Sequence, residues 1–137
     1  MLKSPEIINI EVSKENQKGI SFDELFGAYL EEASVIKLTD PYIKIFFQRR
    51  NFMEFLETIL KFKESGQDLK VHLVTTKADS YEYYKQDDDF EKMKMAVAPH
   101  GIDLSWEYDA TNTIHARHIV TDTGWKITLD RGLDIFQ

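Results

Sequence analysis

Short apolar runs alternate with stretches of helical periodicity along most of this chain. Three runs have the composition and flanking residues of buried strands, and they cover residues 35–39, 71–75 and 102–107. Apolar positions at helical spacing, each set preceded by capping signals, predict helices over residues 21–33, from Asn51 to Ser65-Gly66, and over residues 88–98. This alternation of strands and helices is typical of an α/β fold.

The C-terminal region has a different pattern, in which two strand-like segments flank a tight turn. Residues 114–121 and 125–130 alternate as strands do, and Asp122-Thr123-Gly124 between them suits a hairpin. Residues 7–12 have the pattern of an edge strand, and residues 77–87 that of a polar loop. The whole pattern predicts an α/β sandwich with a mostly parallel sheet, helices on both faces and a C-terminal antiparallel hairpin.

Composition narrows the classes of function. The 137 residues suffice for one domain, and 42% hydrophobic residues suffice for a buried core. The absence of cysteine excludes disulfides, a thiol nucleophile and a cysteine-rich zinc site. A net charge of −7 argues against a general nucleic-acid-binding surface but is compatible with one local anion pocket. No signal peptide or membrane-spanning run is present in the sequence, so we expect a cytoplasmic protein.

The most specific signal is the segment His115-Ala116-Arg117-His118-Ile119-Val120-Thr121-Asp122. It is close to the H-x-K-x4-D signature of phospholipase D-type phosphodiesterases, with arginine in place of the lysine. Because alternate residues of a strand face the same way, we expect His115 and Arg117 to point together at one phosphate, with Asp122 orienting them. His118 alternates to the opposite face, so we predict no shared metal site.

Further candidate residues follow the predicted strands. In parallel sheets, ligand sites form beyond the carboxyl ends of the strands. We therefore expect one cleft to hold His115 and Arg117 together with Asp40, Thr75, Thr76 and Asp109. The pair Asp40-Pro41 is also a helix-start signal, and a helix cap is the plainer interpretation of this carboxylate.

Four segments occur in an order and at a spacing typical of one family: Asp40-Pro41-Tyr42-Ile43, Ile114-His115-Ala116-Arg117, Gly124-Trp125-Lys126-Ile127, and Arg131-Gly132-Leu133-Asp134-Ile135-Phe136. In these segments the chain resembles the phospholipase D-like domain found C-terminal to the MIT (microtubule-interacting and trafficking) domain. The resemblance covers residues 20–137, which we take as the domain, and residues 1–19 are interpreted as a lead-in or linker. It implies a phospholipase D-like sandwich.

A closer likeness is to the version of this domain at the C-terminus of bacterial and archaeal Lon-related AAA+ proteins, some of which are tied to BREX-type phage defence. Residues 113–137 carry it, together with residues 21–30. This likeness implies a covalent AAA+ or Lon-like neighbour in a longer protein. In the eukaryotic relatives the domain pairs with itself and binds anionic membrane lipid instead of hydrolysing it, which implies a homodimer here.

Hydrolysis by this type of site needs two histidines, one as nucleophile on phosphorus and one as general acid. This chain has one copy of the motif, so a phosphodiesterase requires two chains, each contributing one His115. The arginine is larger than lysine, and the G-S-x-N element of the family is replaced by Leu129-Asp130-Arg131-Gly132. We therefore predict a non-catalytic anion-binding and dimerisation module without cofactor or metal, whose ligand is a lipid headgroup, a nucleotide or a nucleic-acid end. The alternatives are a homodimeric, metal-independent phosphodiesterase or nuclease, and a purely structural oligomerisation domain.

Other notable residues have plainer interpretations. Tyr81, Tyr83 and Tyr84 form either a partner-binding patch or part of the packing on the sheet. The three acids Asp87–Asp89 suit the N-terminus of a helix. His72 and His100 are expected to be structural.

Overall fold

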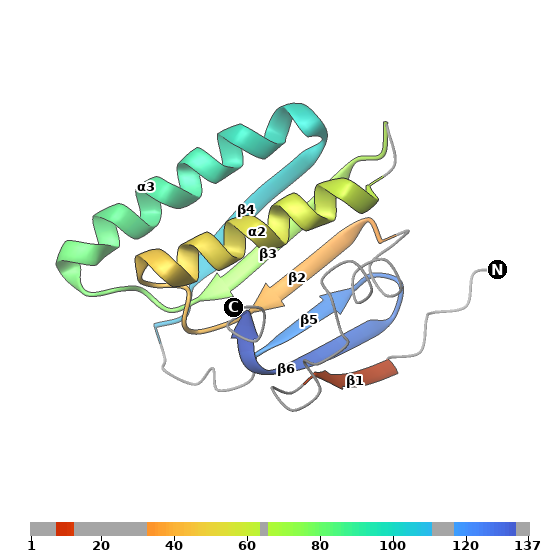
Figure 1. The fold of residues 1–137 in the computed structure, drawn as a ribbon, viewed down its shortest axis with the longest axis horizontal. Helices are drawn as coiled ribbons and strands as arrows, with labels where there is room; N and C mark the ends of the chain where they lie inside the picture. The colour runs from red at the N-terminus through yellow and green to blue at the C-terminus, as the bar shows by residue number, and fades with distance from the viewer. Residues whose placement is uncertain (1–7, 13–32, 64–65, 111–116, 134–137) are drawn as a thin grey trace.

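The computed structural model describes residues 8–12, 33–63, 66–110 and 117–133 of the chain (Figure 1). The elements in chain order are β1 (Ile8–Val12), β2 (Val35–Thr39), α2 (Phe46–Phe62), β3 (Leu69–Thr75), α3 (Ser80–Val97), the short 3-10 helix η1 (Ala98–His100), β4 (Ile102–Tyr108), β5 (His118–Thr121) and β6 (Trp125–Leu133). From β2 to β4 the order alternates strands with helices, and it ends in consecutive strands, as the hydrophobic pattern predicts.

One sheet contains all the described strands in the order β1-β6-β5-β2-β3-β4. β2, β3 and β4 are parallel neighbours, and β1 is parallel to β6. β5 is antiparallel to both β2 and β6, and the β5–β6 turn contains Gly124 at φ 98°. The α/β class, the mostly parallel sheet, the C-terminal hairpin and the edge position of the first strand are therefore confirmed.

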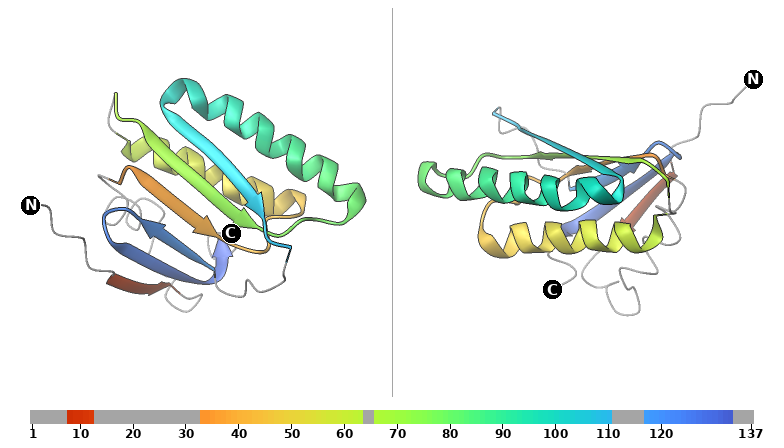
Figure 2. Two further views of the ribbon diagram at one scale, coloured as in Figure 1. Left: turned by 180° about the vertical axis from the view of Figure 1, so that it is seen from behind. Right: turned by 90° about the horizontal axis from the view of Figure 1, so that it is seen from above.

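The two described α-helices, α2 and α3, cover the same face of the sheet (Figure 2, right). α2 connects β2 to β3, and α3 connects β3 to β4. Right-handed crossovers between strands that advance in one direction across a sheet place their helices on one side. Helices on both faces remain a prediction, because the helix expected over residues 21–33 falls outside the described residues apart from its last position.

The core lies between this helix pair and the sheet. The rings of Phe52 and Phe55 in α2 stack with centroids 6.2 Å apart, and Phe90 of α3 meets Phe52 edge-on at 5.9 Å. Leu38 and Leu73 meet these rings from β2 and β3, and none of the five side chains is exposed. Full burial of such a side chain stabilises the fold by about 2 to 3 kcal/mol, so this cluster holds α2 and α3 against the sheet.

α2 begins later than the Asp40-Pro41 signal predicts and earlier than Asn51. Its first residue is Phe46. The Asp40 carboxylate accepts a hydrogen bond from the backbone N–H of Tyr42 at 2.9 Å, which closes a local turn of the Asx type instead of starting a helix. The predictions of Asp40 as a helix cap and of a helix start at Asn51 were therefore wrong.

α3 extends over much of the segment that was predicted to be a polar loop. It begins at Ser80, and its buried positions are Gln86, Phe90, Met93 and Val97. Those positions follow the spacing of one helical face. A glutamine at the first of them interrupts the apolar pattern, which is why the sequence did not indicate the early turns of this helix.

Candidate functional site

The described site residues meet at one edge of the sheet, with Asp122 as the exception. The carboxyl ends of β2, β3 and β4 lie at this edge, and the antiparallel β5 begins there (Figure 1). We call it the carboxyl edge, and the predicted site residues found at it are Asp40, Thr75, Thr76, Asp109 and Arg117. α2 and α3 also begin here, so the partial positive charges of two helix N-termini point toward this edge. His115 lies outside the described residues.

The two threonines of this edge position the loop between β2 and α2. The Thr75 hydroxyl oxygen accepts a hydrogen bond from the backbone N–H of Ile43 at 3.4 Å, and the Thr76 hydroxyl donates one to the carbonyl oxygen of Pro41. Both side chains are buried. The threonines were predicted as ligand-binding residues, and these hydrogen bonds give them a role in holding the loop that carries Asp40 and Tyr42.

Gln86 joins the loops that precede the two helices. Its amide nitrogen donates to the carbonyl oxygens of Ile43 at 2.8 Å and Thr76 at 3.0 Å. Its amide oxygen accepts from the backbone N–H of Ala78 at 2.9 Å, and the side chain is fully buried. Sequence reasoning missed this residue, and the signal that identifies it is its place on the apolar face of α3.

Arg117 stands at the start of β5 with its guanidinium over the ring of Tyr42, 4.5 Å from the ring centroid. The Tyr42 side chain is 47% exposed, and Arg117 is half-buried. The negative face of the ring attracts the guanidinium and limits its freedom. The arrangement therefore presents a positioned cation beside the loop that the threonines and Gln86 fix.

Asp122, the acid of the motif, lies at the other end of β5. One oxygen of its carboxylate accepts hydrogen bonds from the backbone N–H groups of Ser34 at 2.9 Å and Val35 at 3.2 Å. Its own backbone N–H donates to the carbonyl oxygen of Val35. This acid therefore fixes the entry to β2, a full strand length away from Arg117.

Arg49 links the starts of α2 and α3. Its Nε is 2.6 Å from Asp89 Oδ2, and its Nη1 is 3.1 Å from Glu82 Oε2 and also donates to the carbonyl oxygen of Lys44. The arginine is 4% exposed, whereas the two carboxylates are each about one-third exposed. Its burial was not foreseen, because an arginine in a charged segment has no sequence signature of burial.

The acids Asp87–Asp89 occupy the middle of α3, so the prediction that they lie at a helix N-terminus was wrong. Asp87 Oδ1 accepts hydrogen bonds from Trp106 Nε1 at 3.1 Å and from the Tyr108 hydroxyl at 2.9 Å. Burial, and then the hydrogen bond to Asp87, raise the pKa of Tyr108. Asp88 pairs with Lys92, and Asp89 with Arg49. Each acid therefore has its own structural partner.

Large apolar side chains are exposed beside Arg117. Tyr42, Ile45, Phe46 and Phe47 are between 47% and 60% exposed, and we call this group the aromatic rim. The packing interpretation of the α3 tyrosines holds for Tyr83, and a partner-binding patch remains a prediction. Tyr81 and Tyr84 are each 75% exposed, whereas the Tyr83 ring packs on Tyr108 with centroids 5.5 Å apart.

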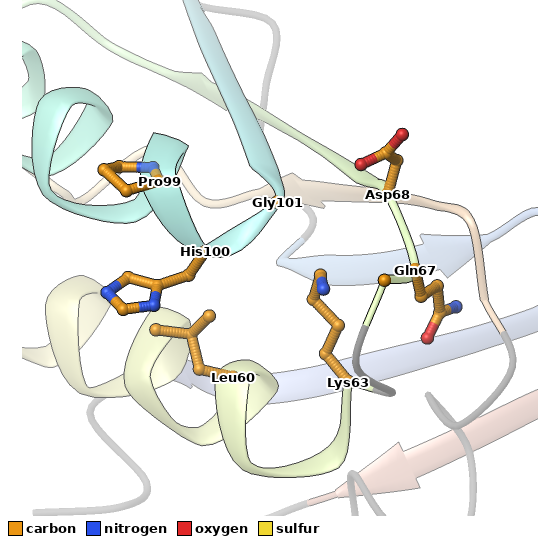
Figure 3. Close-up of a pocket in the computed structure, with 8 residues that line it drawn as sticks. Leu60, Lys63, Gln67, Asp68, Pro99, His100 and Gly101 are labelled. Carbon is orange, nitrogen blue, oxygen red and sulfur yellow. The ribbon is translucent and has the colours of Figure 1, made fainter.

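Two cavities differ in their relation to the predicted residues. One of about 680 Å³ lies near the amino ends of β3 and β4, with Lys63 and His100 at its border (Figure 3), and no predicted site residue lines it. Another of about 400 Å³ opens on the sheet face opposite the helices, and Lys37, Thr39, Asp109 and His118 are among its lining residues.

The described part of the chain offers no cluster of three or more histidine, aspartate or glutamate side chains suited to a metal ion. Within the same residues, neither helix has the length and apolar character needed to cross a membrane.

Comparison with known proteins identifies the family. The family model described as "Phospholipase D-like domain at C-terminus of MIT" matches residues 19–137. MIT domain-containing protein 1 of Mus musculus is 33% identical over 125 residues, which cover 90% of this chain and 49% of that protein. The chain thus spans about half the length of this relative, and the Lon-related likeness remains a prediction. The chain belongs to the family of phospholipase D-like domains that stand at the C-terminus of MIT.

Proposed function

We propose that this domain is a non-catalytic accessory module of a longer protein and that it binds an anionic, phosphate-bearing group at the carboxyl edge. The observation that carries the proposal is the stacking of Arg117 on Tyr42 at this edge. A guanidinium binds phosphate through paired N–H groups, and stacking on a ring limits its freedom before the ligand arrives. The N-termini of α2 and α3 add favourable potential for a negative charge.

The aromatic rim favours a lipid headgroup over a free nucleotide or a nucleic-acid end. Phe46 and Phe47 are more than half exposed and directly follow Lys44 and Ile45. Arg50 stands over the Phe47 ring at 5.5 Å from its centroid. Aromatic and basic side chains together suit the boundary between headgroups and acyl chains of an anionic membrane. In this proposal Arg117 binds the lipid phosphate, while the side chains of the aromatic rim insert between the headgroups of the membrane.

The position of Asp122 argues for binding without turnover. The motif acid is occupied by the backbone of residues 34 and 35 at the far end of β5. In this position it stands a strand length away from Arg117 and does not orient that guanidinium, as the motif would require. The phosphodiesterase and nuclease alternative therefore has no support from the described residues beyond the motif itself.

A covalent neighbour and self-association complete the proposal. The name of the mouse relative includes an MIT domain, and that protein is about twice as long as the matched region. We infer a covalent neighbour of the MIT or the AAA+, Lon-related kind in the complete protein. We also infer a homodimer, which sedimentation velocity over a range of protein concentrations tests directly.

Co-sedimentation with vesicles tests the proposed ligand. Vesicles of phosphatidylcholine are compared with vesicles that contain about one-fifth phosphatidylserine, at fixed ionic strength. We expect binding to the anionic vesicles only, and a loss of about tenfold in affinity for Arg117→Gln. Lys92→Gln on the exposed side of α3 removes the same charge away from the edge and is expected to bind as the parent chain does.

A second substitution separates the two parts of the site. Phe46→Ser is expected to weaken vesicle binding while binding of inorganic phosphate, followed by NMR, stays unchanged. Arg117→Gln is expected to weaken both. Equal binding of Arg117→Gln and the parent chain in both assays would refute the proposal.

A further inference from the structure

The sheet face opposite α2 and α3 carries a group of basic side chains. Side chains alternate along each strand, and the buried positions Ile36, Leu38 and Ile119 face the helices. Lys37, His118 and Lys126 therefore share the opposite face, which we call the open face. The chain as a whole has a net charge of −7, so a local group of bases on this face stands out from its surroundings.

The strand register brings these three residues together. Lys37 pairs with Val120, and Val120 pairs with Lys126, so the two lysines stand on either side of one valine. His118 precedes Val120 by two residues on the same face and is diagonal to both lysines. Diagonal neighbours in antiparallel strands are about 7 to 8 Å apart, a gap that flexible lysine side chains span. Both ammonium groups therefore reach the space above the His118 ring.

Lys37, His118 and Lys126 differ from His72, a base of the same face whose two ring nitrogens contact Ser105 and Glu107. Within the described part of the chain, Lys37 and Lys126 make no hydrogen bond or ion pair, and His118 Nδ1 is buried without a hydrogen-bond partner. Glu107, across the cavity, pairs with His72 Nε2 at 3.0 Å, and Asp109 also has an interaction of its own. A buried ring nitrogen without a partner is costly, and a ligand that supplies one relieves the cost.

We propose that Lys37, His118 and Lys126 form a binding site for one small oxyanion, a carboxylate or a phosphate monoester, on the open face. The cavity of about 400 Å³ that Lys37, Thr39 and His118 line is the entrance to this site. The anion accepts hydrogen bonds from the two ammonium groups and from the imidazole, with Thr39 beside it. Arg117 belongs to the helix-facing side of β5 and takes no part, so this site is independent of the carboxyl edge.

The electrostatic setting of His118 couples this site to pH. Burial, then the charges of Lys126 and Lys37, lower the pKa of His118 from its usual 6.5. The other ionisable side chains at this cavity are those of Glu107 and Asp109 at the end of β4, whereas the Tyr108 hydroxyl lies on the helix side and binds Asp87. An anion between the lysines offsets their repulsion of the imidazolium. Binding therefore raises the pKa of His118, and by linkage the anion binds more tightly as the pH falls.

Long-range ¹H–¹⁵N NMR of the histidine rings tests the proposal in the chain as it is. His118→Gln assigns the His118 signal, and inorganic phosphate and acetate are titrated separately while sodium chloride keeps the ionic strength constant. We expect saturable shifts at His118 and a rise of its pKa by about half a unit or more with the bound anion. Saturation by phosphate alone, acetate alone or both identifies the chemistry of the natural ligand.

Substitutions on the same face decide whether the three residues act together. Lys37→Met and Lys126→Met are each expected to lower the affinity for the anion by about tenfold. Lys70 is an exposed lysine elsewhere on this face, and Lys70→Met is expected to leave the affinity unchanged. Arg117→Gln, which weakens phosphate at the carboxyl edge, is expected to leave the titration read at the His118 signal unchanged, and this difference separates the two sites. An unchanged amide spectrum checks that each variant is folded. The proposal fails if the His118 signal follows ionic strength alone, or if neither Lys37→Met nor Lys126→Met alters the titration.

Discussion

The two faces of the sheet use polar residues in opposite ways. On the helix side, Gln86 and Arg49 are almost completely buried, and their polar groups bind named backbone or carboxylate partners. On the open face, Lys37 and Lys126 make no ion pair within the described residues, and His118 has a buried nitrogen without a partner. Polar groups on the helix side hold the fold together, whereas Lys37, His118 and Lys126 on the open face are the groups that we propose to meet a ligand.

This contrast separates residues that support a site from residues that belong to one. Substitutions on the helix side should change stability and leave ligand affinity alone, unless the loops of the carboxyl edge move. Substitutions on the open face should change affinity with little effect on stability.

Gln86→Leu should lower the free energy of unfolding by about 3 kcal/mol, because it leaves the N–H of Ala78 and the carbonyls of Ile43 and Thr76 buried without partners. Urea unfolding measures the change. Lys85→Leu, one residue earlier and exposed, is the control and should change stability by about 0.5 kcal/mol or less. Equal effects of the two substitutions would show that the hydrogen bonds of Gln86 do not stabilise the fold.

Arg49→Met should destabilise the chain by about 2 kcal/mol, less than a fully buried pair would lose, because Glu82 and Asp89 are partly exposed to water. Arg50→Met removes the same charge at an exposed neighbouring position and should have a much smaller effect. Differential scanning calorimetry compares the three proteins. A similar melting temperature for all of them would mean that the Arg49 network adds nothing to stability.

Asp122→Ala should cost about 1 kcal/mol, because the N–H groups of Ser34 and Val35 lose a shared acceptor that stands in contact with water. Asp122→Asn keeps one oxygen acceptor and should cost less. Phosphate binding at the carboxyl edge should be unchanged in both variants. A loss of Arg117-dependent binding without a loss of stability would show instead that the motif acts as one functional unit.

His118 should give the smallest effect, as a pH dependence of stability. Its folded-state pKa lies below the unfolded value of 6.5, so the unfolded chain binds more protons as the pH falls through that value. His118 therefore makes the protein less stable at about pH 5.5 than at about pH 7.5, and His118→Gln should flatten this dependence. Chemical denaturation at both pH values measures the free energy of unfolding. If the variant showed the same difference between the two pH values as the parent chain, His118 would not be its source.

The fold was largely predictable because its strands are short, apolar and bounded by turn residues. The predicted strand over residues 35–39 coincides with β2, and the hairpin turn before Trp125 lies where Gly124 requires a positive φ. The helix starts were not predictable in the same way. Side chains of Asp40 and Gln48 bind nearby backbone N–H groups, and these hydrogen bonds delay α2 until Phe46.

The candidate site was predictable in location but only partly in its residues. Strand topology brings Arg117 to the carboxyl ends of β2 and β3, as the motif and the parallel pattern indicated together. The exposed ring under Arg117 and the buried Gln86 depend on long-range packing, which one sequence does not reveal. Asp122 matches the motif in spacing, yet its hydrogen bonds are made to the start of β2.

The pairing of β1 with β6 has a consequence for biosynthesis. Ile8 of the first strand pairs with Trp125, so more than a hundred residues separate two neighbours in the sheet. During translation, β1 leaves the ribosome long before β6 exists, whereas β2, β3 and β4 find their neighbours within one crossover each. Contacts so distant in sequence form late and slowly. We therefore expect the β2–β4 unit with its two helices to fold first and β1 to dock after it.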